Sequence, residues 1–354
     1  MKWWLGAGVV LLIAVVGWLV WDFVLAKNWI YPRVVPKIVE RKKIDLERWG
    51  FVPSWNLNKE SKLEEMDKIL FFDLQIGENG NAGTAAELKA LAKLKNKIAQ
   101  NKQKLIVVVS LLKDEKMDTF LKDRQNWQNL VEDLQKIKTD FGVEGVNVDM
   151  EYQSDPTLIL SEEYINFLKY LKTQELGEIS VDVFGNTLLK SSPEKVRSLF
   201  AVADYVVMMG YDFHRPGTVA GAVAPLRAPE GERSIWEIIE ATVKTGVEMK
   251  KLVLALPLYG YEWETGYATS LASMSRLEGL SQAEKEAWSI TYDELGQSEV
   301  WSKKLGDKEV TIYVENTTSL RTKVQAARLA GLSGVGFWAM GYEGKKWDWS
   351  KLWE

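Results

Sequence analysis

Short runs of apolar, largely β-branched residues alternate along this chain with longer stretches whose apolar positions recur every three to four residues. Most of the short runs are almost continuously apolar, which is typical of parallel strands covered by helices. Eight such runs follow residue 48, at residues 49–55, 68–74, 104–112, 144–150, 178–184, 203–209, 251–259 and 334–340. The periodic stretches between them predict amphipathic helices, clearest at residues 85–100, 124–141, 162–174, 233–246 and 319–332.

Eight strand–helix units within residues 48–354 predict an α/β fold, a closed (β/α)8 TIM barrel. An open doubly wound sheet also alternates, but it normally has a glycine-rich loop after its first strand, and residues 56–66 contain no glycine. Residues 261–317 separate the seventh strand from the eighth and include two β-like runs, 288–295 and 309–315. We expect this segment to be an insertion on the barrel rim.

The N-terminal part has a different character. Residues 3–21 contain no charge and begin and end with tryptophans, as expected of a helix that spans a bilayer. The sequence therefore predicts a transmembrane anchor within residues 1–26 and a charged, proline-containing stalk at residues 27–47. A cleavable signal peptide is the alternative, although the apolar run exceeds the usual length of about 7–15 residues.

Composition narrows the possible chemistry. The 354 residues include no cysteine and a single histidine, His214, which excludes disulfides, thiolate metal sites and HExxH metalloproteases. The balance of 45 basic and 49 acidic residues leaves no broad basic field for nucleic acid. Carboxylates, hydroxyls and aromatic rings must therefore perform any chemistry, and we expect no metal and no cofactor.

The fourth predicted strand carries the best candidates. Asn147, Asp149 and Glu151 alternate with apolar residues, so all three share the face that points into the barrel. Barrel enzymes place their catalytic groups at the carboxyl ends of the strands. Two neighbouring carboxyls also raise each other's proton affinity, as a general acid near neutral pH requires. A structural polar network paired with lysine or arginine is the alternative.

This strand resembles the DGxDxDxE signature of glycoside hydrolase family 18, the chitinase-like family. The match lies at Gly145, Asp149 and Glu151, whereas Glu144 replaces the leading Asp and Asn147 replaces the first inward Asp.

Four other strand ends support the same resemblance. Residues 208–212 (MMGYD) are similar to the family's M-x-Y-D motif, and residues 256–261 (LPLYGY) to its PxYG segment. Residues 334–338 (GVGFW) resemble the closing strand, whose tryptophan lies under the sugar. Residues 51–55 (FVPSW) resemble the first strand of cell-wall members of the spore-germination type. The resemblance runs from about residue 48 to the C-terminus.

The resemblance implies a substrate-assisted, retaining glycosidase. Glu151 would be the general acid, Asp149 would orient the substrate's acetamido group, and Tyr211 would donate a hydrogen bond to its oxygen. Sugar-binding residues would be Asn147, Asp212, Trp338, Met209, Tyr259 and Trp55. Simple packing is the alternative for Tyr211, Met209 and Trp338.

The sequence thus predicts a membrane-tethered glycosidase acting on polymers that contain N-acetylglucosamine, either peptidoglycan or chitin-like. A non-catalytic carbohydrate-binding barrel stays open because of Asn147. An unrelated barrel enzyme with a carboxylate-bound metal is a third and weaker alternative. We expect Asn147 to donate its amide N–H to Asp149 and keep that carboxylate anionic. The basic stalk favours a cytoplasmic barrel, whereas the inferred polymer favours an extracytoplasmic one, which we expect.

Overall fold

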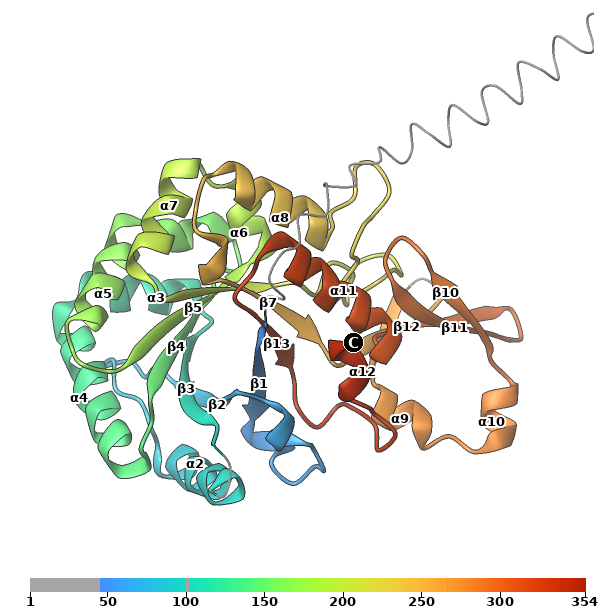
Figure 1. Ribbon diagram of the computed structural model, residues 1–354, viewed down its shortest axis with the longest axis horizontal. Helices are drawn as coiled ribbons and strands as arrows, with labels where there is room; N and C mark the ends of the chain where they lie inside the picture. The colour runs from blue at the N-terminus through green and yellow to red at the C-terminus, as the bar shows by residue number, and fades with distance from the viewer. Residues whose placement is uncertain (1–44, 100–101, 266) are drawn as a thin grey trace, which may run out of the picture. The chain divides into compact units, whose positions relative to one another are not determined.

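The computed structural model describes residues 45–99, 102–265 and 267–354 (Figure 1). The predicted anchor and most of the predicted stalk, residues 1–26 and 27–44, lie outside the described residues. Within the described part of the chain, no helix has the length and apolarity needed to cross a membrane. Residues 45–354 form one compact unit.

Eight parallel strands close into a barrel in the order β1-β13-β7-β6-β5-β4-β3-β2, which confirms the predicted fold (Figure 1). Each strand follows its predicted run, with ends displaced by at most two residues. The strands are β1 (Glu47–Pro53), β2 (Lys68–Gln75), β3 (Lys104–Leu111), β4 (Gly145–Met150), β5 (Glu178–Phe184), β6 (Tyr205–Met209), β7 (Leu252–Pro257) and β13 (Gly334–Trp338).

Helices cover the outside of the barrel. They begin and end at local signals: the Thr84 hydroxyl caps the first of them in a capping box with Glu87, and Gly331 (φ 76°) ends the last long one in the left-handed conformation. The α-helices are α2 (Ala85–Ile98), α3 (Asp114–Lys122), α4 (Arg124–Phe141), α5 (Glu162–Lys172), α6 (Gly185–Lys190), α7 (Pro193–Val202), α8 (Ile235–Lys244), α11 (Thr317–Ala330) and α12 (Ser350–Trp353). Short 3-10 turns are η1 (Ser54–Asn56), η2 (Leu63–Glu65), η3 (Pro156–Leu160) and η4 (Met249–Lys251).

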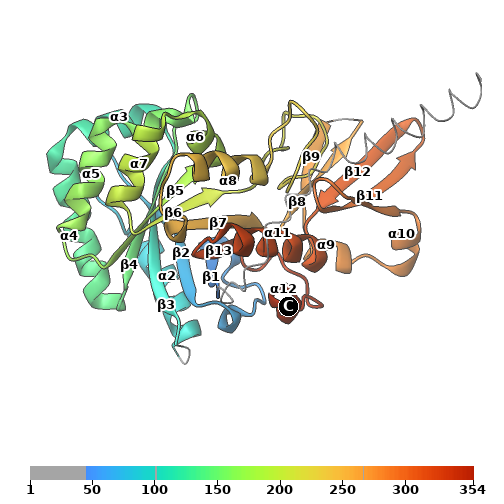
Figure 2. The ribbon, with the colours of Figure 1, turned by 45° about the horizontal axis from the view of Figure 1, so that its top comes forward.

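The rim insertion is a separate antiparallel sheet at one side of the barrel (Figure 2). Its five strands lie in the order β10-β11-β12-β8-β9, so the two predicted runs, now β10 and β12, do not pair with each other. The intervening β11 was missed because two lysines, Lys303 and Lys304, interrupt its apolar pattern. The elements are β8 (Gly260–Glu264), β9 (Tyr267–Ala272), α9 (Met274–Glu278), α10 (Gln282–Glu286), β10 (Ser289–Asp293), β11 (Ser298–Leu305) and β12 (Lys308–Val314).

The barrel lumen is packed in layers. At the amino ends of the strands the buried Lys68 ammonium lies between Glu47 (2.9 Å) and Glu178 (2.7 Å) and over the rings of Trp49 and Tyr205. An apolar layer follows, formed by Trp49, Phe51, Leu70, Ile106, Val108, Val207, Val253 and Ala255. Above it, toward the carboxyl ends of the strands, lie the polar residues of β4 and β5.

Candidate active site

The inward row of β4 lies where its alternation predicts. Asn147 and Asp149 are buried, and Glu151 follows at the barrel mouth with partial exposure. The intervening Val146 and Val148 are buried on the opposite face, toward the helices. The strand period therefore aligns the amide and both carboxyl groups along one side of the lumen.

Asn147 does not bond as the sequence led us to expect. Its amide nitrogen donates to Asp182 Oδ1 (2.7 Å) and to Ser180 Oγ (3.0 Å), both on β5, and not to Asp149. The register explains this correction, because Asn147 lies directly opposite Ser180 and therefore faces β5. Asn147 is fully buried, and its amide holds Asp182, which lines the cavity described below whereas Asn147 does not.

The surroundings of Asp149 also differ from the expectation, because they favour its protonated form. Burial, followed by the charges of Glu151 and Asp182, raises the pKa of Asp149 well above its usual range. Burial raises the pKa of Glu151 as well, against the hydrogen bond from Gln153. Burial raises the pKa of Asp182 to about 8, although the Asn147 amide lowers it. The site therefore favours the protonated forms of all three carboxyls, which is the direction that a general acid requires.

A cavity of about 210 Å³ opens above these groups. Seven of the nine predicted site residues line it: Asp149, Glu151, Met209, Tyr211, Asp212, Tyr259 and Trp338. Trp55 lies just outside, more than half exposed, with its ring edge-on to Phe72 (5.9 Å) and Trp338 (6.3 Å). The structure thus brings together the ends of β1, β4, β6, β7 and β13, as the motifs predict.

Hydroxyl donors surround Asp212. Its Oδ1 accepts from Tyr259 (2.5 Å) and Tyr261 (3.2 Å), and its backbone lies in the left-handed region (φ 59°). Burial raises the pKa of Asp212, and the two tyrosine hydrogen bonds oppose that rise. Burial, with the nearby carboxylates, also raises the pKa of Tyr211 well above its usual value, so Tyr211 is a neutral donor at any physiological pH.

Aromatic rings form the opposite wall. Trp338, at the end of β13, lines the cavity and forms T-shaped ring pairs with Phe72 (4.7 Å) and Phe51 (6.1 Å). An acid, a neutral hydroxyl donor and an apolar face in one cavity match what hydrolysis of a sugar linkage requires.

Comparison with known proteins decides the family. The sequence matches Glycosyl hydrolases family 18 over residues 47–343. The chain belongs to this family. The resemblance found in the motifs is therefore confirmed, and a family 18 barrel extends over almost the whole described region.

This chain is similar to several kinds of protein. It is 22% identical to the cortical fragment-lytic enzyme of Bacillus subtilis, over 69% of this chain and 58% of that protein. It resembles the spore cortex-lytic enzyme SleL of Bacillus megaterium (TM-score 0.70, 19% identity, 88% and 73% of the two chains). It also resembles a chitinase of Cycas revoluta in complex with (GlcNAc)3 (TM-score 0.68, 20% identity, 83% and 94%). The matched part spans about half to three fifths of the length of the curated relatives.

Several site residues of the family 18 barrel escaped the sequence reasoning. Asp182 could have been predicted from the sequence, because Ser180 and Asp182 alternate with apolar residues in β5 as the inward residues of β4 do. Gln153 donates to Glu151 Oε2 (2.8 Å) from the loop after β4, where no period marks it. Phe72, Phe184 and Arg215 also line the cavity. Trp263 is fully buried in the rim packing, and His214 lines a neighbouring cavity.

Within the described ranges, no group of three or more histidine, aspartate or glutamate residues is arranged to hold a metal ion.

Proposed function

We propose that this chain is a glycosidase that hydrolyses β-linked glycans containing N-acetylglucosamine. One observation carries the proposal: Glu151 lies with raised pKa beside a second buried carboxyl, Asp149, in a cavity walled by Trp338. A protonated carboxyl next to an apolar sugar platform is suited to protonating a glycosidic oxygen.

The proposed reaction is substrate-assisted and retaining, one of the known exceptions to the two-carboxylate scheme. Glu151 gives its proton to the glycosidic oxygen while the C1–O bond breaks. The carbonyl oxygen of the substrate's 2-acetamido group attacks C1 and forms an oxazolinium. A water molecule then attacks C1, the bond between C1 and the acetamido oxygen breaks, and the Glu151 carboxylate accepts the proton of the water.

Three neighbours support these steps. Asp149 would accept the acetamido N–H and stabilise the positive charge that develops on the ring nitrogen. Tyr211 would donate its hydroxyl proton to the acetamido oxygen, and its high pKa keeps that proton in place. Trp338 would stack under the sugar, with Trp55 extending the aromatic surface outward.

Two substrate classes fit this reaction. Relatives with the same fold are named as a cortex-lytic enzyme and as a chitinase, and one solved chitinase holds (GlcNAc)3. Peptidoglycan and chitin-like oligomers both contain the required 2-acetamido sugar.

Hydrolysis should be tested with the full chain on a fluorogenic N-acetylglucosamine oligomer and on purified cell wall, with Glu151→Gln in parallel. We expect release of product by the unchanged chain and loss of turnover in the variant. Binding of an oligosaccharide by calorimetry without cleavage of either substrate would instead favour the carbohydrate-binding alternative, which Asn147 suggested.

Membrane anchoring also stays a proposal, based on the charge-free residues 3–21. We propose that these residues hold the protein in the cell membrane with the barrel on the wall side. Protease treatment of intact cells tests this arrangement. Survival of the barrel while external control proteins are cut would show the opposite orientation.

A further inference from the structure

The proposed general acid, Glu151, lies where the chain leaves the barrel sheet. Its backbone N–H donates to the carbonyl oxygen of Leu111 in β3 (3.2 Å). The β4 loop (residues 152–154) follows and belongs to neither a helix nor a strand. The side chain of Gln153 nevertheless returns to the acid and donates its amide N–H to Glu151 Oε2 (2.8 Å). Contacts other than strand pairing must therefore hold this loop in place.

Helix α3, which follows the neighbouring strand β3, holds the β4 loop. The Asp114 carboxylate accepts the backbone N–H groups of Gln153 (2.8 Å) and Ser154 (3.1 Å), and it also accepts the Ser154 hydroxyl. One turn further along the helix, Asp118 accepts the hydroxyl of Tyr152 (2.6 Å). Residues four apart share one face of a helix, so both carboxylates lie on the same side of α3. All three residues of the loop are thus bonded to this helix.

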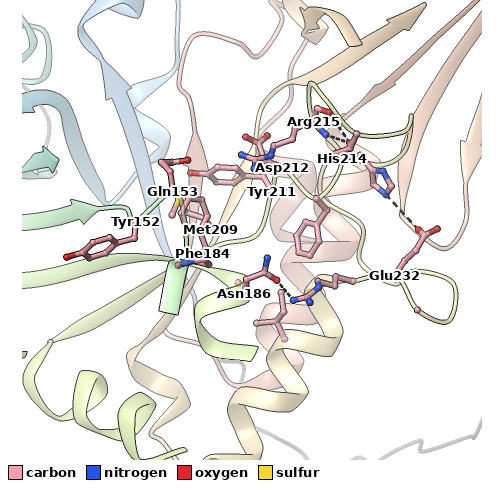
Figure 3. A pocket seen from close by; sticks show the side chains of 17 residues that line it. Tyr152, Gln153, Phe184, Asn186, Met209, Tyr211, Asp212, His214, Arg215 and Glu232 are labelled. Carbon is pink, nitrogen blue, oxygen red and sulfur yellow. Dashed lines mark hydrogen bonds and ion pairs between the residues drawn. The ribbon is translucent and has the colours of Figure 1, made fainter. Parts of the chain in front are cut away.

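Consecutive side chains of the β4 loop point in opposite directions. Figure 3 shows Gln153 extending toward Tyr211, whereas the Tyr152 ring extends away from both. Gln153 lines the catalytic cavity, and Tyr152 is buried with its hydroxyl bonded to Asp118. The loop backbone therefore carries an anchor on one side and the contact to the acid on the other.

A second role for Asp114 would be to stabilise the start of α3, where the helix dipole favours negative charge. Glu115 lies in the same first turn, and in the part of the chain that the structure describes it makes no ion pair. The two acids therefore allow a role in the helix to be separated from a role in the loop. The Ser154 hydroxyl and the backbone N–H of Gln153 lower the pKa of Asp114, so Asp114 stays a carboxylate while Glu151 titrates.

The bond from Gln153 affects both the orientation and the proton of Glu151. In a protonated carboxyl group the carbonyl oxygen is the better acceptor, so this bond makes Oε2 that oxygen and leaves the proton to Oε1. Burial raises the pKa of Glu151, and the bond from Gln153 lowers it, because the N–H favours the charged form. Without this bond the carboxyl would rotate more freely and bind its proton more tightly.

Other titratable groups also face Glu151. They are Asp149 on β4, Asp182 on β5, and Tyr211, Asp212 and Arg215 after β6. These groups remain when Gln153 or Asp114 is substituted. A change in the titration of Glu151 in such variants therefore reports the β4 loop.

We propose that Asp114, acting through Gln153, is a positioning residue for the general acid: α3 fixes the β4 loop, and the loop fixes the carboxyl group of Glu151. The inference rests on the proposed function and adds to it a residue that lies outside the lining of the catalytic cavity.

The test measures the pH dependence of kcat/KM for the full chain on a fluorogenic N-acetylglucosamine oligomer. Gln153→Met keeps the length of the side chain but has no donor, so the alkaline limb of the profile should move to higher pH. Turnover at the optimum should fall by about 10-fold as orientation is lost, with KM within about twofold. Asp114→Asn has one acceptor oxygen in place of two and should cause the same changes to a smaller extent.

A double variant decides whether Asp114 acts through Gln153. Asp114→Asn in the Gln153→Met background should change kcat by less than about twofold and leave the profile where Gln153→Met puts it. The matched control is Glu115→Gln, which removes one charge from the same turn of α3 and should leave kcat and the profile unchanged. Additive effects would contradict the proposal. A lower Tm in Asp114→Asn with an unmoved profile would leave Asp114 a structural role alone and overturn the proposal as well.

A measurement without cleavage separates this inference from the proposed function. In a chain made with isotope-labelled glutamate, the carboxyl carbon signal of Glu151 is identified by its loss in Glu151→Gln, and its shift with pH follows the acid directly. We expect a midpoint at higher pH in Gln153→Met and in Asp114→Asn. That result without hydrolysis by the unchanged chain would overturn the glycosidase and leave the positioning role intact. Hydrolysis with the same midpoint in every chain would overturn the positioning role and leave the glycosidase intact.

Discussion

Both ends of the barrel lumen bury charged side chains, but the charges are neutralised within the protein at only one end. At the amino ends of the strands, Lys68 lies between Glu47 and Glu178 and against two aromatic rings. At the carboxyl ends, Asp149, Glu151 and Asp182 lie together, and no ion pair of the described residues includes any of them.

The difference follows from the role of each end. In a (β/α)8 barrel the residues at the amino ends of the strands contribute to stability, whereas the chemistry takes place at the carboxyl ends. A buried cation with two carboxylates and no unsatisfied donor is suited only to hold strands together. Two buried carboxyls, Asp149 and Asp182, and the partly exposed Glu151 beside them favour their protonated forms instead, which costs stability and supplies an acid.

The largest effect is expected at the carboxyl ends of the strands, in Glu151→Gln. The amide keeps the shape of the side chain but has no acidic proton, so kcat should fall by about 100-fold or more. The dissociation constant for an oligosaccharide should stay within about threefold, measured by calorimetry, because the sugar platform is untouched. Glu194→Gln, on the exposed surface of α7, is the control. Turnover like that of the unchanged chain would remove Glu151 from the mechanism.

At the amino ends of the strands, a substitution should change the stability of the fold. Lys68→Met leaves two carboxylates without their cation, and the free energy of unfolding should fall by about 3 kcal/mol in urea titration. The control is Lys172→Met, since the Lys172–Asp204 pair (2.6 Å) is more than a third exposed on both sides and should contribute about 1 kcal/mol or less. Equal losses in the two variants would contradict the contrast between buried and exposed pairs.

Asp182→Asn tests how much stability is lost by burying a carboxyl at the carboxyl ends of the strands. A carboxyl with a raised pKa binds its proton more tightly in the folded chain, so its contribution is complete below about pH 4 and is lost as the pH rises through about 8. The asparagine variant, which still accepts from Asn147, should flatten that fall and raise the Tm at pH 8 by about 2–4 °C.

Calorimetric scans between pH 4 and about pH 8 measure this change, with Asp140→Asn on the exposed side of α4 as the control. A variant that melts below the unchanged chain at the alkaline end would show that Asp182 is held charged by the fold.

The smallest effect is expected from Asn147→Asp. It places a second carboxyl next to Asp182, where the amide nitrogen now lies 2.7 Å from Oδ1, and the two must share a proton. The pH–rate profile should move to higher pH, with turnover changed by less than about 10-fold. Asn147→Leu removes the donor without adding a charge and separates the two effects. An unmoved profile in Asn147→Asp would disconnect Asp182 from the reaction.

The barrel and its mouth were predictable from sequence for a physical reason. A strand between two buried layers is almost continuously apolar, so its polar interruptions at Asp149 and Glu151 stand out and point inward together. Helix ends could be predicted where one residue favours the conformation that ends a helix, as Gly331 does in the left-handed region.

The contacts of the site residues could not be predicted, because they depend on pairing between segments far apart in the sequence. Nothing in the β4 sequence states that Asn147 faces Ser180 and thus bonds to Asp182; only the register between β4 and β5 fixes that contact. Arg215 and Arg233 likewise lie in irregular segments without a period, so no pattern in the sequence places both of them along one cavity.

The hydrogen bond from Tyr261 to Asp212 joins the rim sheet to the catalytic mouth, since Tyr261 belongs to β8 and Asp212 follows β6. Exchange of this rim between related barrels would replace one of the donors that lower the pKa of Asp212. An insertion that reshapes the cleft therefore also changes the proton affinity of a carboxyl inside it.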